Sequence, residues 1–162
     1  MIPKEQQTLL IIYGRGGHKE QMKRLLESLK QHKEFDFVSI ADVNDELGSL
    51  EHLRCPEPRD KFHFWKAPFQ LTYTAFVTLI QTLRLLRRHN IVGLVSTGPG
   101  MAVIPSILFR LCRKKVVYLE SWSRFYSASA TGIFMYKIAN RFYVQNETML
   151  AKYPKATYSG RL

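Results

Sequence analysis

The sequence has only two cysteines, few acidic residues in its second part, and no hydrophobic run that clearly spans a membrane. Cys55 and Cys112 lie far apart without a CxxC pattern, which argues against a disulfide framework or a zinc site and predicts a reducing compartment. The polar start, M-I-P-K-E-Q-Q, leads directly into a strand pattern, so no secretory signal peptide is expected. The uncharged stretch Ala67–Leu83 is at the short limit for a membrane span and is interrupted by proline, threonine and glutamine.

Charge is distributed unevenly along the 162 residues. Residues 1–66 are electrically balanced, whereas residues 67–162 contain 13 Lys/Arg and two Asp/Glu and so carry the whole net charge of +11. This asymmetry predicts an anionic partner for the second part, such as a phosphate ligand or an acidic membrane surface. Nucleic acid is the weaker candidate, because no helix-turn-helix, RNP or zinc-finger pattern is present.

The stretch Ile91–Ser121 predicts the fold class. Ile91–Val95 and Val116–Leu119 are short apolar strands, and between them a Ser96–Gly100 loop precedes apolar residues at helical spacing. Fully apolar strands that are joined through a helix predict a parallel sheet covered on both faces. At this length, we expect one α/β, Rossmann-like domain over residues 1–162.

The remaining elements follow from periodicity and turn residues. Further strands are predicted at Thr8–Tyr13, Phe35–Ile40, Lys61–Lys66, Arg141–Val144 and Ala156–Tyr158. Further helices are predicted from the first glycine turn to about His32 and at Phe69–Arg88, Thr131–Ala139 and Glu147–Lys152. Residues Glu46–Lys61 are polar and irregular, so we expect a surface loop there.

The carboxyl ends of these strands carry the candidate ligand-binding residues, since ligands of open α/β sheets bind at that edge. Glycine turns there permit close approach of the backbone, and a helix N-terminus suits a phosphate. The first turn is neither a G-x-G-x-x-G fingerprint nor a P-loop. The candidates for substrate binding are Gly14, Arg15, Gly16, Gly17, Ser96, Thr97, Gly98, Gly100, Ser121 and Arg124.

Glu120 and His18 are the candidate catalytic residues. Glu120 follows a buried strand, and it either anchors a nearby helix or Arg124, or acts chemically at the ligand edge. His18 can act as a base, bind a phosphate or cap the first helix. Ser96 and Thr97 can cap the following helix or bind a ligand, and Arg124 can hold a phosphate in bidentate fashion. No nucleophile elbow, metal-ligand spacing or cofactor motif is present.

The helix predicted at Phe69–Arg88 is more apolar than a surface helix requires. It either packs on the sheet or lies in a membrane interface with its basic end on lipid headgroups, and different faces can serve both purposes. The candidate membrane contacts are Phe69, Phe76, Leu83, Arg84, Arg87 and Arg88.

Four motifs together resemble a known family: R-G-G-H at 15–18, S-T-G-P-G-M-A-V-I-P at 96–105, K-K-V-V-Y-L-E-S at 114–121, and Q-N-E-T-M-L-A-K-Y-P-K-A-T-Y-S-G at 145–160. The chain resembles PssD-type exopolysaccharide and capsule biosynthesis proteins. It is similar also to the membrane-anchor subunit of the eukaryotic enzyme that adds the second GlcNAc to dolichol pyrophosphate. That subunit has an N-terminal membrane helix, and no such helix is expected here.

The resemblance implies the N-terminal, acceptor-binding half of a split GT-B glycosyltransferase, for which MurG looks like the fused version. A separate UDP-sugar-binding subunit would be the partner, and a polyprenyl-pyrophosphate-linked sugar would be the acceptor. Glu120 or His18 would take the proton from the attacking hydroxyl without a cofactor or metal. The chain would act in the cytoplasm, peripherally on the inner face of the cell membrane. The alternatives are a non-catalytic recruiting scaffold and a stand-alone nucleotide-binding enzyme.

Overall fold

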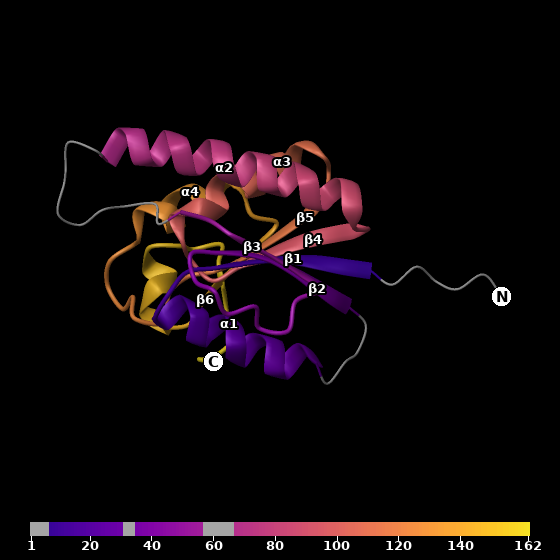
Figure 1. The fold of residues 1–162 in the computed structure, drawn as a ribbon. Coiled ribbons are helices and arrows are strands. Elements are labelled where there is room, and N and C mark those ends of the chain that lie inside the picture. Colours follow the sequence, from indigo (N-terminus) through magenta and orange to yellow (C-terminus); the bar gives the residue numbers. More distant parts are fainter. Residues whose placement is uncertain (1–6, 31–34, 57–66) are drawn as a thin grey trace.

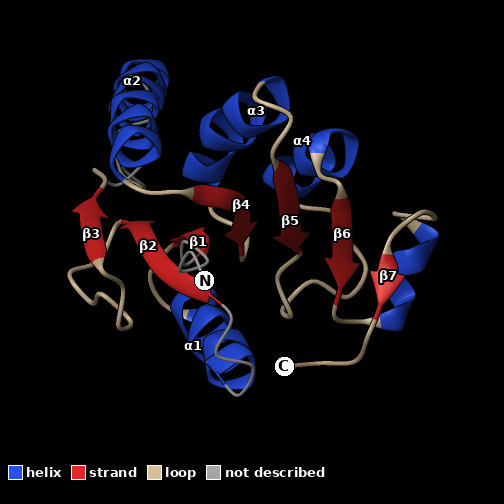
Figure 2. Cartoon of the chain, turned by 90° about the vertical axis from the view of Figure 1, so that its right-hand side faces the viewer, coloured by secondary structure: helices blue, strands red, loops and turns tan. Residues whose placement is uncertain are grey.

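The computed structural model describes residues 7–30, 35–56 and 67–162, and within them all seven strands form one parallel sheet in the order β3-β2-β1-β4-β5-β6-β7. Figures 1 and 2 show this sheet at the centre of the molecule. The strands are β1 (Gln7–Tyr13), β2 (Phe35–Ala41), β3 (Glu51–Arg54), β4 (Ile91–Ser96), β5 (Lys115–Leu119), β6 (Arg141–Val144) and β7 (Thr157–Tyr158). The predicted parallel α/β sheet is confirmed.

Helices cover both faces of the sheet. Helix α1 (Gly17–Lys30) packs on one face, and α2 (Ala67–Arg88), α3 (Val103–Leu111) and α4 (Ala130–Ile138) pack on the other (Figure 2). Short 3-10 turns, η2 (Gly100–Ala102) and η3 (Glu147–Ala151), precede α3 and β7. This is the predicted Rossmann-like arrangement.

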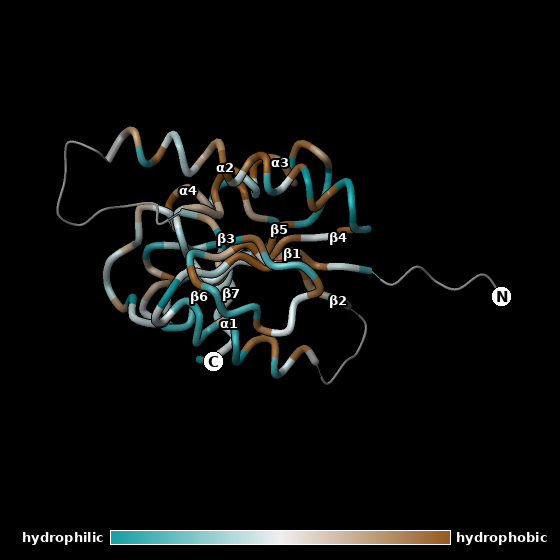
Figure 3. Tube along the Cα trace, in the orientation of Figure 1, coloured by the Kyte–Doolittle hydropathy of each residue, from teal (hydrophilic) through white to brown (hydrophobic). Residues whose placement is uncertain are grey.

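The core is divided between the two faces by the alternation of side chains along each strand. On β1, Leu10 and Ile12 belong to the cluster under α2, α3 and α4, whereas Ile11 and Tyr13 pack with Met22 of α1. Figure 3 shows the hydrophobic strands at the centre. Burial on both faces explains why β1 has an uninterrupted apolar sequence.

The third strand lies at a different place from the one predicted. The structure forms β3 from Glu51–Arg54, which the sequence analysis assigned to a surface loop, and pairs it with Val38–Ala41 of β2. Such a short, polar segment carries no apolar alternation because it is the edge strand of the sheet. The predicted strand Lys61–Lys66 lies outside the described residues.

Helix α2 has its polar and apolar residues reversed relative to an ordinary surface helix. Thr74, Thr78 and Thr82 face the protein and are buried, and the hydroxyls of Thr78 and Thr82 donate to the carbonyls four residues earlier. This local bonding lets threonine pack inside without a distant partner. The opposite side exposes a run of large apolar residues, which we call the α2 apolar face: Phe69, Tyr73, Phe76, Ile80 and Leu83.

Candidate functional site

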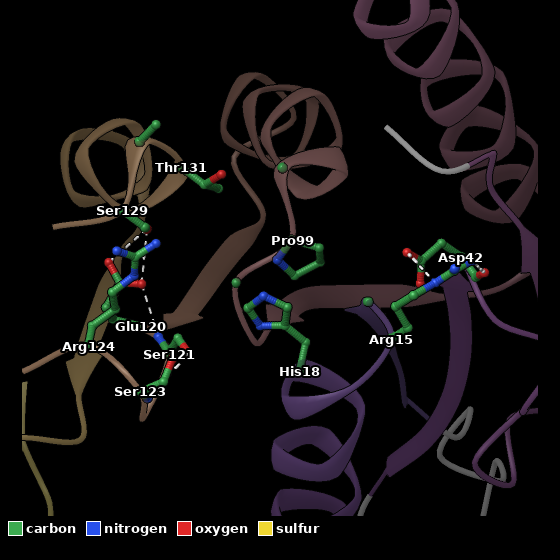
Figure 4. A pocket seen from close by; sticks show the side chains of 14 residues that line it. Arg15, His18, Asp42, Pro99, Glu120, Ser121, Ser123, Arg124, Ser129 and Thr131 are labelled. Atoms are coloured by element: carbon green, nitrogen blue, oxygen red, sulfur yellow. Dashed lines mark hydrogen bonds and ion pairs between the residues drawn. The ribbon is translucent and has the colours of Figure 1, made fainter. Parts of the chain in front are cut away.

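A pocket of about 450 Å³ lies at the carboxyl edge of the sheet (Figure 4). The loops after β1, β2, β4 and β5 and the first residues of α4 line it, which is where ligands of open parallel sheets are expected. Its lining residues are Gly14, Arg15, His18, Asp42, Gly98, Pro99, Gly100, Glu120, Ser121, Ser123, Arg124, Ser129, Ala130 and Thr131.

His18 lies in the first turn of α1, near the middle of the pocket in Figure 4. Its Nδ1 is 2.5 Å from the carbonyl oxygen of Thr97, and the Thr97 hydroxyl donates to the carbonyl of His18 at 2.8 Å. A carbonyl can only accept a hydrogen bond, so Nδ1 carries a proton, and the tautomer with its lone pair on Nε2 is the one that this contact selects. Within the part of the chain that the structure describes, Nε2 has no protein partner. The reciprocal bonds to Thr97 therefore leave a fixed acceptor nitrogen in the pocket.

Gly98 is required by this placement of His18. Its φ is +116°, a conformation that L side chains rarely adopt, and a Cβ there would lie 2.6 Å from His18 Cε1. The Ser96 hydroxyl, 3.4 Å away, accepts from the Gly98 amide and supports the same turn. The glycine at 98 thus lets the loop after β4 close over the imidazole.

Glu120 is almost entirely buried, with 1% of its surface exposed, and donors surround its carboxylate. Oε1 accepts from the Ser121 amide at 3.0 Å, Oε2 accepts from the Tyr153 hydroxyl at 2.8 Å, and the Ser129 hydroxyl lies 3.0 Å from both oxygens. Burial, followed by the negative charge of Glu120, raises the pKa of Tyr153, so this phenol stays protonated and donates. Glu120 therefore connects the end of β5, the start of α4 and the turn between η3 and β7.

The start of α4 approaches Glu120 closely because residue 132 is glycine. The Ser129 hydroxyl accepts from the Gly132 amide at 2.8 Å, which makes Ser129 the N-cap of α4. A Cβ on Gly132 would lie 1.9 Å from Glu120 Oε2. The carboxylate thus lies at the positive end of the helix dipole, where negative charge is stabilised.

The structure brings together most of the predicted site residues but not all of them. Gly14, Arg15, His18, Gly98, Gly100, Glu120, Ser121 and Arg124 line the pocket. Gly16, Gly17, Ser96 and Thr97 do not line it; Gly16 has a φ of +66° in the turn, and Ser96 and Thr97 are buried beneath it. Glu120 and His18 lie at the same edge of the sheet.

Six lining residues were not among the individual candidates from the sequence: Asp42, Pro99, Ser123, Ser129, Ala130 and Thr131. Asp42 follows β2 directly, so its position at a strand end was an available indication. The contribution of Ser129–Thr131 depends on where the long loop after β5 returns to the sheet, which no local pattern specifies.

The basic end of α2 is partly engaged by the edge strand. Glu51 of β3 lies 3.5 Å from Arg84, 3.2 Å from Arg88 and 3.0 Å from His89. These contacts lower the pKa of Glu51, and the hydrogen bond with His89 is the largest cause. Phe69, Phe76 and Leu83 lie on the exposed α2 apolar face, with 81% of Phe69 exposed.

In the segments 7–30, 35–56 and 67–162, no helix has the length and apolar character to cross a membrane. The same segments contain no cluster of three or more histidine, cysteine, aspartate or glutamate side chains that would suit a metal ion.

Sequence comparison identifies the family. Residues 9–162 match the family described as "Oligosaccharide biosynthesis protein Alg14 like". The chain belongs to this family. The Candida albicans protein named "UDP-N-acetylglucosamine transferase subunit ALG14" is 29% identical over 95% of this chain and 77% of its own length. The Homo sapiens protein of the same name is 26% identical over 99% of this chain and 85% of its own length. The resemblance to a transferase-subunit family is confirmed.

Solved structures show the same fold at low sequence identity. MurG of Acinetobacter baumannii superposes with a TM-score of 0.65 and 13% identity, covering 96% of this chain and 45% of that chain. UDP-GlcNAc 2-epimerase from Methanocaldococcus jannaschii gives a TM-score of 0.65 with 10% identity, covering 91% of this chain and 42% of that chain. This Alg14-like chain thus has the Rossmann-like fold of one half of a GT-B glycosyltransferase and spans less than half of these larger structures.

Proposed function

We propose that this Alg14-like chain is the acceptor-binding subunit of a two-part glycosyltransferase. It binds a polyprenyl-pyrophosphate-linked sugar in the pocket and works with a separate subunit that holds the UDP-sugar. The observation that carries the proposal is the convergence of His18, Arg15, Arg124 and the start of α4 on one pocket. The family's relatives, which are named subunits of a UDP-N-acetylglucosamine transferase, make UDP-GlcNAc the first donor to test.

The pocket suits a pyrophosphate. Arg124 lines it, and its guanidinium can donate two hydrogen bonds to phosphate oxygens, whereas Arg15, on the opposite side, pairs with Asp42 (Figure 4). Ala130 and Thr131, the first residues of α4, also line it, and the amides at a helix N-terminus attract anions. The carboxylate of Glu120 repels a bound pyrophosphate only weakly, because donors in the protein already surround it.

His18 is the general base in this proposal, and Glu120 is a positioning residue. Nε2 of His18 has the free lone pair that is needed to take a proton from an attacking sugar hydroxyl, and Thr97 fixes its direction. The hydroxyl oxygen then bonds to the anomeric carbon of the donor sugar, and the bond from that carbon to the nucleotide diphosphate breaks. Glu120 acts indirectly, by holding the start of α4 and its amides against the pocket.

The need for a partner is supported by the lengths of the relatives. MurG is a single chain of which this fold covers 45%, whereas this chain covers 77–85% of the two named subunits. Those subunits are therefore too short to contain a second half of similar size. The remaining half of the cleft would come from another polypeptide, and the product would be a lipid-linked saccharide such as an exopolysaccharide, capsule or O-antigen repeat unit.

Reconstitution tests the function directly. The chain is mixed with its partner, UDP-GlcNAc and a short-chain polyprenyl-pyrophosphate sugar, and the product is measured by mass spectrometry. We expect transfer only when both proteins are present. Transfer by this chain alone, or none from a folded pair with a panel of UDP-sugars, would refute the proposal.

Two variants separate the base from the positioning residue. His18→Gln is expected to lower kcat by roughly 10²- to 10⁴-fold with little change in acceptor KM, as expected for loss of a general base. Glu120→Gln is expected mainly to raise the acceptor KM and to lower thermal stability. The opposite pattern would make Glu120 the base.

The same proposal places the α2 apolar face on an anionic membrane, peripherally and on the cytoplasmic side. Exposed aromatic and aliphatic residues can insert at the headgroup boundary while nearby arginines contact lipid phosphates. Arg87 is the most available of the three candidate arginines, since Arg84 and Arg88 pair with Glu51.

Vesicle sedimentation tests the membrane contact. Burial of a phenylalanine is worth about 1.5–3 kcal/mol, so Phe69→Ser with Phe76→Ser should weaken binding to phosphatidylglycerol vesicles by at least roughly tenfold. Leu50→Ser is the matched control, because Leu50 is about as exposed as Phe76 but lies in the loop between β2 and β3, outside the α2 apolar face. Equal binding of the double variant and the control would refute the contact.

A further inference from the structure

Asp42 has an unusual environment at the edge of the pocket. It follows β2 directly, lines the pocket, and is only 7% exposed. Its Oδ2 lies 3.6 Å from Nε of Arg15. Its Oδ1 is buried and has no hydrogen-bond partner among the residues that the structure describes. A buried carboxylate oxygen without a donor is energetically costly, which indicates a donor from outside the protein.

The two carboxylates of the pocket differ in this respect. Both oxygens of Glu120 receive hydrogen bonds from the protein, whereas Oδ1 of Asp42 receives none. Figure 4 shows Glu120 with Arg124 on one side of His18 and Asp42 with Arg15 on the other. The Arg124 end of the pocket can therefore donate hydrogen bonds to an anion. At the other end, Oδ1 of Asp42 can accept a hydrogen bond from a ligand.

The chemistry of Asp42 selects the kind of group it binds. An ionised carboxylate can only accept hydrogen bonds and repels phosphate, so a neutral hydroxyl is the matching donor. In dinucleotide-binding sheets, an acidic residue about 20 residues beyond the glycine turn binds a ribose hydroxyl. Here the ring would be that of the acceptor sugar, because the pyrophosphate joined to it fits the Arg124 end.

We propose that Oδ1 of Asp42 accepts a hydrogen bond from a hydroxyl of the acceptor sugar and so determines which lipid-linked sugars bind. The role rests on the proposed function. Asp42 holds the ring while the reactive hydroxyl faces His18, which lies between the two ends of the pocket (Figure 4). Asp42 is thus a specificity residue for the sugar, whereas the α4 end recognises the pyrophosphate.

Binding measurements on this chain test this role. Calorimetry compares a short-chain polyprenyl pyrophosphate that carries GlcNAc with the same lipid pyrophosphate without sugar. Losing a hydrogen bond to a charged group should weaken binding of the sugar-bearing ligand to Asp42→Ala by roughly 10- to 100-fold. Binding of the sugar-free ligand should not change. Asp45→Asn is the matched control, since Asp45 lies only three residues further along but does not line the pocket.

Deoxy sugars distinguish recognition from a structural role. For the ligand that lacks the bonded hydroxyl, wild type and Asp42→Ala should bind equally. A loss of the same size for both original ligands, or for neither, would overturn the role of Asp42 and leave the proposed function standing. If the wild-type chain bound neither ligand, the proposed function itself would fail.

A third arm uses UDP-GlcNAc, whose ribose also has hydroxyls. If UDP-GlcNAc bound the chain alone and lost affinity in Asp42→Ala, the hydroxyl would belong to the nucleotide, and the assignment to the acceptor would be wrong. Circular dichroism melting of Asp42→Ala checks its fold. Should this variant unfold, Asp42→Asn, which keeps the size of the side chain but offers only a neutral acceptor, replaces it and should give a smaller loss that is again confined to the sugar-bearing ligand.

Discussion

Replacing Gly132 by alanine should destabilise the protein, although Gly→Ala within a helix ordinarily stabilises by about 0.5–1 kcal/mol. The reversal follows from the close approach of α4 to Glu120. The added Cβ would lie 1.9 Å from Glu120 Oε2 and 2.5 Å from the Tyr153 hydroxyl, whereas ordinary contact begins near 3.4 Å. The helix or the carboxylate must therefore move by about 1.5 Å.

The magnitude follows from what that movement breaks. Glu120 would lose its bonds from the Ser129 and Tyr153 hydroxyls, and a hydrogen bond to a charged group is worth about 1.5–3 kcal/mol. Water that reaches the carboxylate would restore part of the lost hydrogen bonding. We therefore expect the free energy of unfolding to fall by about 3–4 kcal/mol, which lies within the combined cost of the lost hydrogen bonds and of overpacking. At about 2–4 °C per kcal/mol for a chain of this size, the Tm should fall by roughly 6–16 °C.

Thermal and urea unfolding, followed by circular dichroism, measure this loss. Gly100→Ala is the matched control, because its Cβ would lie 3.5 Å from the Thr131 hydroxyl, an ordinary contact. We expect the control to change Tm by no more than about 2 °C, as for substitutions without a steric conflict. A Gly132→Ala protein as stable as this control would refute the packing of α4 on a buried carboxylate.

Three further predictions concern other parts of the chain. Burial raises the pKa of the Cys55 thiol to about 12, so iodoacetamide at pH 8 should alkylate exposed Cys112 and leave Cys55 unmodified; equal labelling in mass spectrometry would contradict this. The pKa of Glu51 is lowered, so its contribution to stability is present above the ordinary value of 4.5 and is lost as pH falls through the lower, folded-state pKa. The Tm difference between wild type and Glu51→Gln should thus shrink below pH 4.5, and a constant difference would exclude the ion pairs as its source. Gly98→Ala should displace His18 and lower activity of the reconstituted pair by at least roughly 100-fold, the lower range for loss of a general base, and unchanged kcat would show that the loop tolerates the Cβ.

Much of the site was predictable because strand ends are predictable. Apolar runs locate β1, β4 and β5, and the residues that follow parallel strands meet at one edge of the sheet. Those two facts brought His18 and Glu120 into one predicted site, and both line the pocket. The sequence could not decide whether Glu120 anchors a helix or acts chemically, since its donors Ser129 and Tyr153 come from 9 and 33 residues further along the chain.

The sequence by itself determined the parallel α/β fold, the positions of the glycine turns and the concentration of positive charge after residue 66. These are properties of local pattern and composition, so they do not depend on how the elements pack. Only the tertiary structure decided that the threonines of α2 face inward, that Glu51–Arg54 forms the edge strand, and that Asp42 shares a pocket with Arg124. The physical reason is that packing chooses which face of a helix or strand is buried, and that choice depends on partners distant in sequence.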